Sequence, residues 1–267
     1  MTTTAIANQA RQLRLSGLLT TLELRLQEAR SHDLTHEEFL STIFTDELNI
    51  RKQRTIARRT KAATFREART LEDFDFTFNP TIKRPQIYDL AAGGFIDQAR
   101  DLLLLGPPGV GKSHLAQALG HNLIKLGKTV LYRSIFDIFD ILADLNHQSD
   151  NPQRHQKTLN NYLRCDLLII DDMGIKHLPP KSGEHLFEII MRRYELRSTL
   201  MTSNRPLEEW GKLLGDVPAA TAILDRFLHH AKILQITGRS YRLKDRATRE
   251  NATAKEASQN KSETPES

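Results

Sequence analysis

The stretch LLLLGPPGVGKSHLAQALG, at residues 102–120, carries the clearest structural signal in the chain. Its four leucines indicate a buried strand, and the residues from Lys112 onward show the pattern of a helix. Between them, residues 106–113 match the spacing G-x-x-x-x-G-K-[ST] in full. A loop of this sequence between a strand and a helix wraps the phosphates of a nucleotide. The stretch therefore predicts an α/β fold with a nucleoside triphosphate site.

Each part of this loop has an expected role in holding the nucleotide. Its glycines let backbone N–H groups turn toward the phosphates, and the positive end of the following helix faces them. Lys112 is expected to reach the β- and γ-phosphates, and the Ser113 hydroxyl to ligate Mg²⁺. The nucleotide-binding residues predicted from the loop are Gly106, Pro107, Pro108, Gly109, Val110, Gly111, Lys112 and Ser113.

The pattern that follows predicts a three-layer fold around a parallel sheet. Strands that are apolar throughout are covered on both faces, which is typical of a parallel sheet between two layers of helices. The expected strands lie at about 101–105, 129–133, 166–171, 198–203 and 232–237. The expected helices lie near 113–126, 135–146, 155–164, 181–195, 206–214 and 219–230. Residues 71–80 and 83–85 predict an irregular connection ahead of the sheet.

The two ends of the chain differ from this α/β region. Residues 1–68 show helical periodicity without a strand signal, and Thr35 and Glu38 have the spacing of a capping box. We expect a small all-helical domain there, followed by an ATPase domain at 69–245. Residues 246–267 are small and polar, and they are expected to form a disordered tail.

Two acids end the strand expected at 166–171. The carboxyl ends of parallel strands meet at one edge of the sheet, beside the phosphate loop. Asp171 is therefore predicted to hold Mg²⁺ through water, and Asp172 to polarise the water that attacks the γ-phosphate. A solvated strand edge is the alternative for two adjacent acids.

Polar residues after the expected strand at 198–203 and on the expected helix at 219–230 can be interpreted either as site residues or as ordinary turn and surface residues. Asn204 follows an expected strand, where an amide near the γ-phosphate orients water. A turn asparagine before Arg-Pro is equally compatible with its spacing. For Arg226, spacing alone favours a surface salt bridge. His229 and His230 are adjacent on one expected helix, so we expect packing or surface residues that do not face one metal ion together.

Charge and cysteine content indicate which partners and which cellular compartment suit this chain. The net charge is +5, and residues 51–61 contain a cluster of Lys and Arg. This cluster is either a solvated helix face or a contact with DNA phosphates, which requires only clustered positive charge.

The single cysteine, Cys165, excludes an internal disulfide, and no apolar run reaches the length of a membrane span. The first 17 residues lack the apolar core of a secretory signal, so we expect a cytoplasmic protein without membrane contact.

Several segments together resemble the IstB transposition helper ATPases, in the initiator and helicase-loader branch of the AAA+ superfamily. The segments are SHLAQALG after the phosphate loop, LLIIDD at 167–172, TSNRPLEEWG at 202–211 and AILDRFLHHAKILQITGRSYRLKD at 222–245. LRLSGLLTTLELRLQEA at 13–29 and TLEDFDF at 70–76 are also similar to that family. The resemblance covers roughly residues 10–245.

The resemblance implies a role for three further residues. Asn204 would be a sensor of the γ-phosphate, and Arg226 an arginine finger that reaches the nucleotide of a neighbouring subunit, which requires a homo-oligomer. Arg242 would be a candidate second sensor that contacts the nucleotide. ATP is favoured over GTP, because no guanine-reading N-K-x-D segment is present.

The resemblance also implies a biological role. Such proteins are encoded beside a DDE-type transposase in bacterial insertion sequences. They assemble on double-stranded DNA with ATP and Mg²⁺ and stimulate or target the transposase, with ATP hydrolysis as a switch. The alternative is a helicase loader similar to DnaC, which would share every nucleotide-site residue and differ in its partner. A small-molecule kinase is disfavoured, because no arginine-rich lid lies between Asp172 and Asn204.

Overall fold

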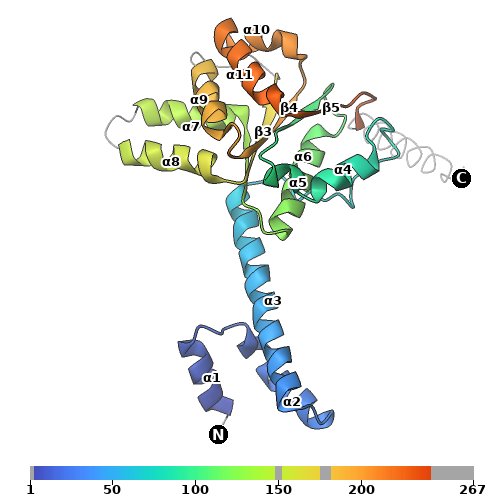
Figure 1. Ribbon diagram of the computed structural model, residues 1–267, viewed down its shortest axis with the longest axis vertical. Helices are drawn as coiled ribbons and strands as arrows, with labels where there is room; N and C mark the ends of the chain where they lie inside the picture. The colour runs from blue at the N-terminus through green and yellow to red at the C-terminus, as the bar shows by residue number, and fades with distance from the viewer. Residues whose placement is uncertain (1–2, 148–151, 175–181, 242–267) are drawn as a thin grey trace, which may run out of the picture. The chain divides into compact units, whose positions relative to one another are not determined.

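The computed structural model describes residues 3–147, 152–174 and 182–241 (Figure 1). The chain divides into two compact units, at residues 1–61 and 62–267. Each unit contains its own cluster of buried apolar side chains. None of the described helices is long and apolar enough to cross a membrane.

Every described element of the first unit is a helix. Its elements are α1 (Thr3–Gln12), the 3-10 helix η1 (Leu18–Thr20), α2 (Leu22–Ser31) and most of α3 (His36–Ala63). The capping box expected before α3 is confirmed. The N–H of Thr35 donates to the Glu38 carboxylate at 2.9 Å, and the N–H of Glu38 donates to the Thr35 hydroxyl at 3.3 Å. Ala10, Leu18, Leu22 and Ile43 form the buried core.

A buried carboxylate ties the loop before η1 to α3. Glu47 is 4% exposed and accepts hydrogen bonds from the backbone N–H groups of Gly17 and Leu18, at 2.6 and 2.9 Å. The Nε of Arg51 also donates to it, at 2.5 Å. Burial raises the pKa of Glu47, but these donors outweigh burial and hold the pKa below its ordinary value. The fold of this unit therefore depends on an ionised glutamate.

The second unit is built on a parallel sheet with the strand order β2-β3-β4-β1-β5. The strands are β1 (Leu102–Leu105), β2 (Val130–Ser134), β3 (Leu167–Met173), β4 (Ser198–Ser203) and β5 (Lys232–Gln235). The predicted parallel sheet is confirmed, and each strand lies where a short apolar run predicts it.

Helices cover both faces of this sheet (Figure 1). One layer contains α4 (Arg84–Ala91), α5 (Gly94–Asp97) and α6 (Lys112–Lys125). The other contains α7 (Ile135–His147), α8 (Pro152–Arg164), α9 (Ser182–Arg193), α10 (Trp210–Leu214) and α11 (Val217–His229). Alternate residues of β3 pack against the two helical layers. Leu168 and Ile170 belong to the core with α7 to α11, whereas Ile169 lies against Gly120 of α6. The predicted three-layer arrangement is therefore present.

Three local expectations differ from the structure. The segment KRP was expected to be irregular, but α4 begins at Arg84, with Pro85 in its first turn, where proline is well tolerated. The last strand ends at Gln235 rather than 237, because β1 is its one neighbour among the described strands and β5 is mostly exposed at the sheet edge. The helix expected at 206–214 is a 3-10 turn, η2 (Leu207–Glu209), followed by the short α10. The expected tail at 246–267 lies outside the described residues.

Candidate nucleotide-binding site

A cavity of about 900 Å³ lies at the carboxyl ends of β1, β3 and β4. Its lining includes the loop after β1, Asp172 at the end of β3, and Asn204 and Arg205 after β4. Because the strands are parallel, their carboxyl ends share one edge of the sheet. The structure thus brings together the loop, the second acid and the asparagine that the sequence predicts as one site.

The loop has the backbone shape that phosphate binding requires. Gly109 and Gly111 have φ angles of 82° and 102°, in the left-handed region that favours glycine. A Cβ atom at Gly109 would lie 2.0 Å from the Ser240 hydroxyl, so a side chain is also excluded by space. α6 starts at Lys112, directly after Gly111, and its first N–H groups face the loop as an anion site. The Lys112 ammonium donates to the carbonyl groups of Gly106 and Pro107, both at 2.8 Å, which keeps its charge within the loop.

The first acid is fully buried and held by three hydroxyl groups. Asp171 is 0% exposed and accepts hydrogen bonds from Ser113, at 3.0 Å, and from Thr202 and Tyr132. Burial and the Asp171 charge raise the pKa of Tyr132, which therefore stays protonated and donates. Oxygen ligands beside a phosphate loop suit Mg²⁺, so the facing oxygens of Ser113 and Asp171 fit that ion.

The second acid lies in a strained and ion-paired position. Asp172 has a φ of 69°, at a register irregularity between β3 and β4, and its N–H donates to the Thr202 hydroxyl at 3.2 Å. Its carboxylate accepts from Nη1 of Arg66 at 2.6 Å. The Arg66 side chain is 50% exposed and that of Asp172 is 17% exposed. A guanidinium thus neutralises the acid that faces the cavity.

No sequence motif singles out Arg66, Tyr132 or Thr202. Tyr132 and Thr202 are polar residues inside strands that are otherwise apolar, and that contrast is a signal that could have drawn attention to them. Arg66 offers no comparable signal, because it follows α3 and lies 106 residues before its partner Asp172 in the chain. Its position depends on the segment after α3, where the Thr64 hydroxyl donates to the carbonyl of Tyr132 at 3.1 Å.

Of the remaining predicted residues, Asn204 lines the cavity. The N–H of Asn204 donates to the carbonyl of Met173 at 3.0 Å, which ties the ends of β3 and β4 together. Arg226 is not among the described residues that line the cavity. Its side chain is 47% exposed, with Cζ 5.4 Å from the ring centre of Tyr194 and a long contact of 3.9 Å to Asp225. Arg242 lies outside the described residues.

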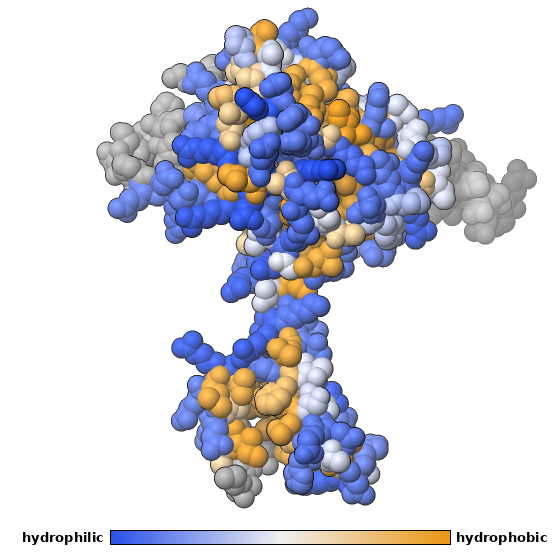
Figure 2. Space-filling view, in the orientation of Figure 1, coloured by the Kyte–Doolittle hydropathy of each residue, from blue (hydrophilic) through white to orange (hydrophobic). Residues whose placement is uncertain are grey.

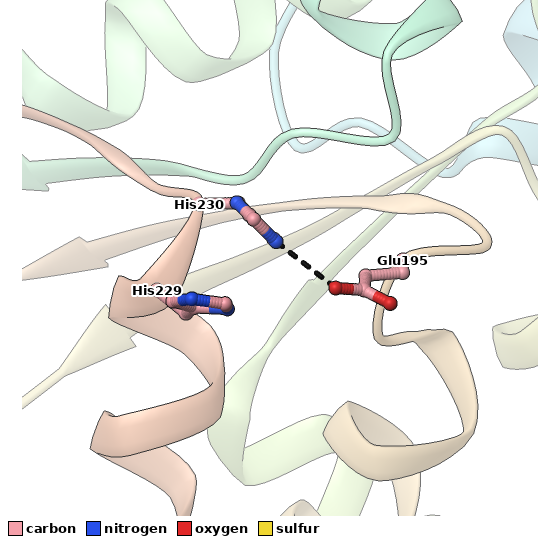
Figure 3. Close-up of side chains that lie close together, drawn as sticks. All are labelled: Glu195, His229 and His230. Carbon is pink, nitrogen blue, oxygen red and sulfur yellow. Dashed lines mark hydrogen bonds and ion pairs between the residues drawn. The ribbon is translucent and has the colours of Figure 1, made fainter.

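The two histidines where α11 ends lie beside Glu195 (Figure 3). Ligand atoms of Glu195, His229 and His230 all lie within 4.8 Å of one another, and Nε2 of His230 lies 3.0 Å from Oε1 of Glu195. The expectation that the two imidazoles cannot face one ion was wrong, because α11 ends at His229 and His230 no longer follows the helical rotation. All three side chains are exposed, as surface residues are.

The sheet order, the phosphate loop after β1 and the acids at the end of β3 define a P-loop nucleoside triphosphatase fold of the AAA+ type. The sequence profile of IstB-like ATP binding proteins matches residues 8–249. The chain belongs to this family of ATP-binding proteins, as the resemblance in the sequence predicts.

Individual relatives support the assignment. The chain is 38% identical over 235 residues to the insertion sequence IS21 putative ATP-binding protein of Pseudomonas aeruginosa, covering 88% of this chain and 87% of the relative. It is 36% identical over 222 residues to the IS5376 putative ATP-binding protein of Geobacillus stearothermophilus, covering 83% of this chain and 87% of the relative.

Solved structures share the fold. A crystal structure of DnaI superposes with a TM-score of 0.52 at 22% identity, covering 63% of this chain and 91% of that one. AMPPCP-bound DnaA from Aquifex aeolicus superposes with a TM-score of 0.51 at 22% identity, covering 65% of this chain and 51% of that one. At these identities the likeness supports the AAA+ fold alone.

Proposed function

We propose that this chain is an ATPase that regulates DNA transposition. It binds ATP with Mg²⁺, assembles into a homo-oligomer on double-stranded DNA, and stimulates or targets a DDE-type transposase, with ATP hydrolysis as the switch. The observation that carries the proposal is the phosphate loop beside two carboxylates of different character, one buried and one facing the cavity, in a chain whose relatives are named as insertion-sequence ATP-binding proteins.

The two acids have separate roles in this proposal. Ser113 and Asp171 would hold Mg²⁺, which would supply positive charge to the β- and γ-phosphates. Asp172 takes a proton from the attacking water as the water oxygen bonds to the γ-phosphorus. The bond from the γ-phosphorus to the bridging oxygen breaks, and ADP leaves. Asn204 orients the same water, and Lys112 balances charge on the phosphates.

Arg226 supports the proposed oligomer. An arginine that stabilises the charge of the transferred phosphoryl group must reach the nucleotide. Arg226 is exposed on α11 and does not line the cavity of its own chain among the described residues. A neighbouring subunit is therefore the site at which it would act. The stacking of Arg226 on Tyr194 holds its charge at the surface.

The helical unit supplies the proposed contacts with DNA and with the transposase. Arg51, Arg54, Arg58 and Lys61 are spaced for one face of α3. Arg51 and Arg54 also bind within the unit, to the carbonyl of Arg14 and the hydroxyl of Ser16, whereas Arg58 and Lys61 are exposed. The latter pair is thus placed for phosphate backbones.

Apolar side chains on the same unit favour a protein contact. Hydrophobic residues gather on the face of this unit that Figure 2 shows. The exposed large side chains are Leu13, Leu24, Leu34, Leu40, Phe44 and Leu48. Exposed apolar groups of this kind mark protein interaction sites. We assign them to assembly or to the transposase.

Co-purification tests the partner. The full chain, with ATP and DNA present, is expected to retain the transposase of its insertion sequence, and not a hexameric replicative helicase. Retention should be lost in a Leu40→Ser, Phe44→Ser protein whose ATP turnover is intact. Retention of the helicase alone would instead assign the chain to helicase loading.

A further inference from the structure

A cluster of three side chains that commonly bind metal ions lies where α11 ends. Oε1 of Glu195 lies 3.0 Å from Nε2 of His230, and one ligand atom from each of Glu195, His229 and His230 lies within 4.8 Å of the other two. The carboxylate comes from the turn after α9 and the imidazoles come from the end of α11 (Figure 3). None of the three is among the described residues that line the cavity, so the cluster is separate from the nucleotide site of its own chain.

The packing of α9 against α11 anchors the two segments that carry these side chains. Ile190 of α9 and Phe227 of α11 are 3% and 0% exposed and belong to the same buried core. Beyond His230, the N–H of Lys232 at the start of β5 donates to the carbonyl of Asp101 at 2.9 Å. Because both backbone segments are anchored, a bound ion would have to order only the three side chains, which lowers the entropy cost of binding.

Two further features orient the cluster. Glu195 has a φ of 57°, in the left-handed region that is uncommon for residues other than glycine. Such conformations persist only where the surrounding structure imposes them, and they gather at ligand sites. The Tyr194 hydroxyl lies 2.6 Å from Nδ1 of His229 and holds that ring in one orientation. Metal-binding histidines depend on polar neighbours that fix the ring in this way.

The types of ligand and their spacing suit zinc. Zinc binds nitrogen and oxygen at about 2.0–2.2 Å in a tetrahedron, so neighbouring ligand atoms lie about 3.3–3.6 Å apart. The pair at 3.0 Å is already near this spacing, and the side chains are exposed, so rotation can close the longer separations. Two histidines and one glutamate form a known zinc set that leaves a fourth position for water, whereas Mg²⁺ prefers oxygen ligands throughout.

We propose that Glu195, His229 and His230 bind a zinc ion, with water in the fourth position. The ion joins the turn after α9 to the end of α11. Its binding does not depend on the proposed ATPase function, because the ligands lie outside the nucleotide cavity of their own chain.

Zinc titration of the full chain without nucleotide tests the proposal. The chain is expected to take up one Zn²⁺ in competition with a chromogenic chelator, and millimolar Mg²⁺ should not displace the ion. His229→Gln, His230→Gln and Glu195→Gln should each weaken zinc binding by at least about tenfold, because loss of a partner outside the ligand shell already has an effect of that size. The chain contains ten histidines, so His32→Gln with His36→Gln, which alters two exposed histidines of the first unit, is the matched control and should bind zinc normally.

Thermal unfolding gives a second readout. An ion that binds the folded chain raises the midpoint of unfolding. Zinc should raise the midpoint of the unaltered chain and of the control, but not that of a protein with both His229→Gln and His230→Gln. Absence of saturable zinc uptake in the presence of Mg²⁺ would overturn the proposal. Equal zinc affinity in the cluster variants and the unaltered chain would also overturn it, as would an equal thermal shift in the double variant.

Discussion

The ion pair between Arg66 and Asp172 predicts that removal of Arg66 raises basal ATP turnover. Arg66→Ala takes a guanidinium away from the acid proposed to activate water. The pair is short, at 2.6 Å, but the Arg66 side chain is 50% exposed, so solvent screens it. Pairs of this exposure contribute at most about 1 kcal/mol. That energy corresponds to a roughly fivefold change in the fraction of Asp172 that is free of the pair. We therefore expect kcat without DNA or partner to rise by up to about fivefold.

Phosphate release at saturating ATP measures the effect. Arg197→Ala is a matched control, because Arg197 pairs with Asp166 at the same 2.6 Å, is 47% exposed, and lies at the opposite end of β3. The control should leave kcat unchanged. A fall in kcat for Arg66→Ala, with normal turnover in the control, would show that Arg66 assists the reaction rather than restrains the acid, and the reasoning would be refuted.

Three further predictions concern the interface, DNA and the helical unit. Arg226→Ala should lower turnover by about a thousandfold or more without loss of ATP binding, and mixing it with Lys112→Ala should restore part of the activity at interfaces that pair intact halves. A flat ATPase rate across all mixing ratios, with mixed assembly verified, would contradict a finger in trans. Arg58→Glu with Lys61→Glu should weaken binding to duplex DNA about equally on all sequences and reduce its salt dependence, measured by fluorescence anisotropy at several salt concentrations. The lowered pKa of Glu47 stabilises the fold above the unfolded value of 4.5, and this contribution is lost as the pH falls below it. Urea unfolding followed by circular dichroism at pH 5.5 and pH 4 should show the loss in the unaltered chain, and a smaller one in Glu47→Gln.

The sheet could be predicted because its strands are continuous apolar runs, and the position of the site follows from it. A parallel sheet places every carboxyl end at one edge, so the phosphate loop, Asp172 and Asn204 had to meet there. The short α4 escaped prediction because eight residues give little periodicity and its proline suggests a break. The length of β5 was overestimated because the sequence does not say which strand lies at the edge.

The partners of the acids could not be predicted, because they come from distant parts of the chain. Tyr132 on β2 and Thr202 on β4 meet Asp171 only through the strand order, which places β3 between them. Arg66 reaches Asp172 from the segment after α3. Such features depend on tertiary contacts, which local patterns do not specify.

The most direct test of the account compares ATP binding and ATP turnover in a single Asp172→Asn preparation. Asp171 and Ser113 are unaltered there, so ATP affinity in the presence of Mg²⁺ should stay within a few-fold of the unaltered chain. Turnover should fall by about a hundredfold or more, because an amide does not take a proton from water. Normal turnover in this variant would contradict the proposed chemistry. Loss of ATP binding together with turnover would contradict the separation of roles between the two acids.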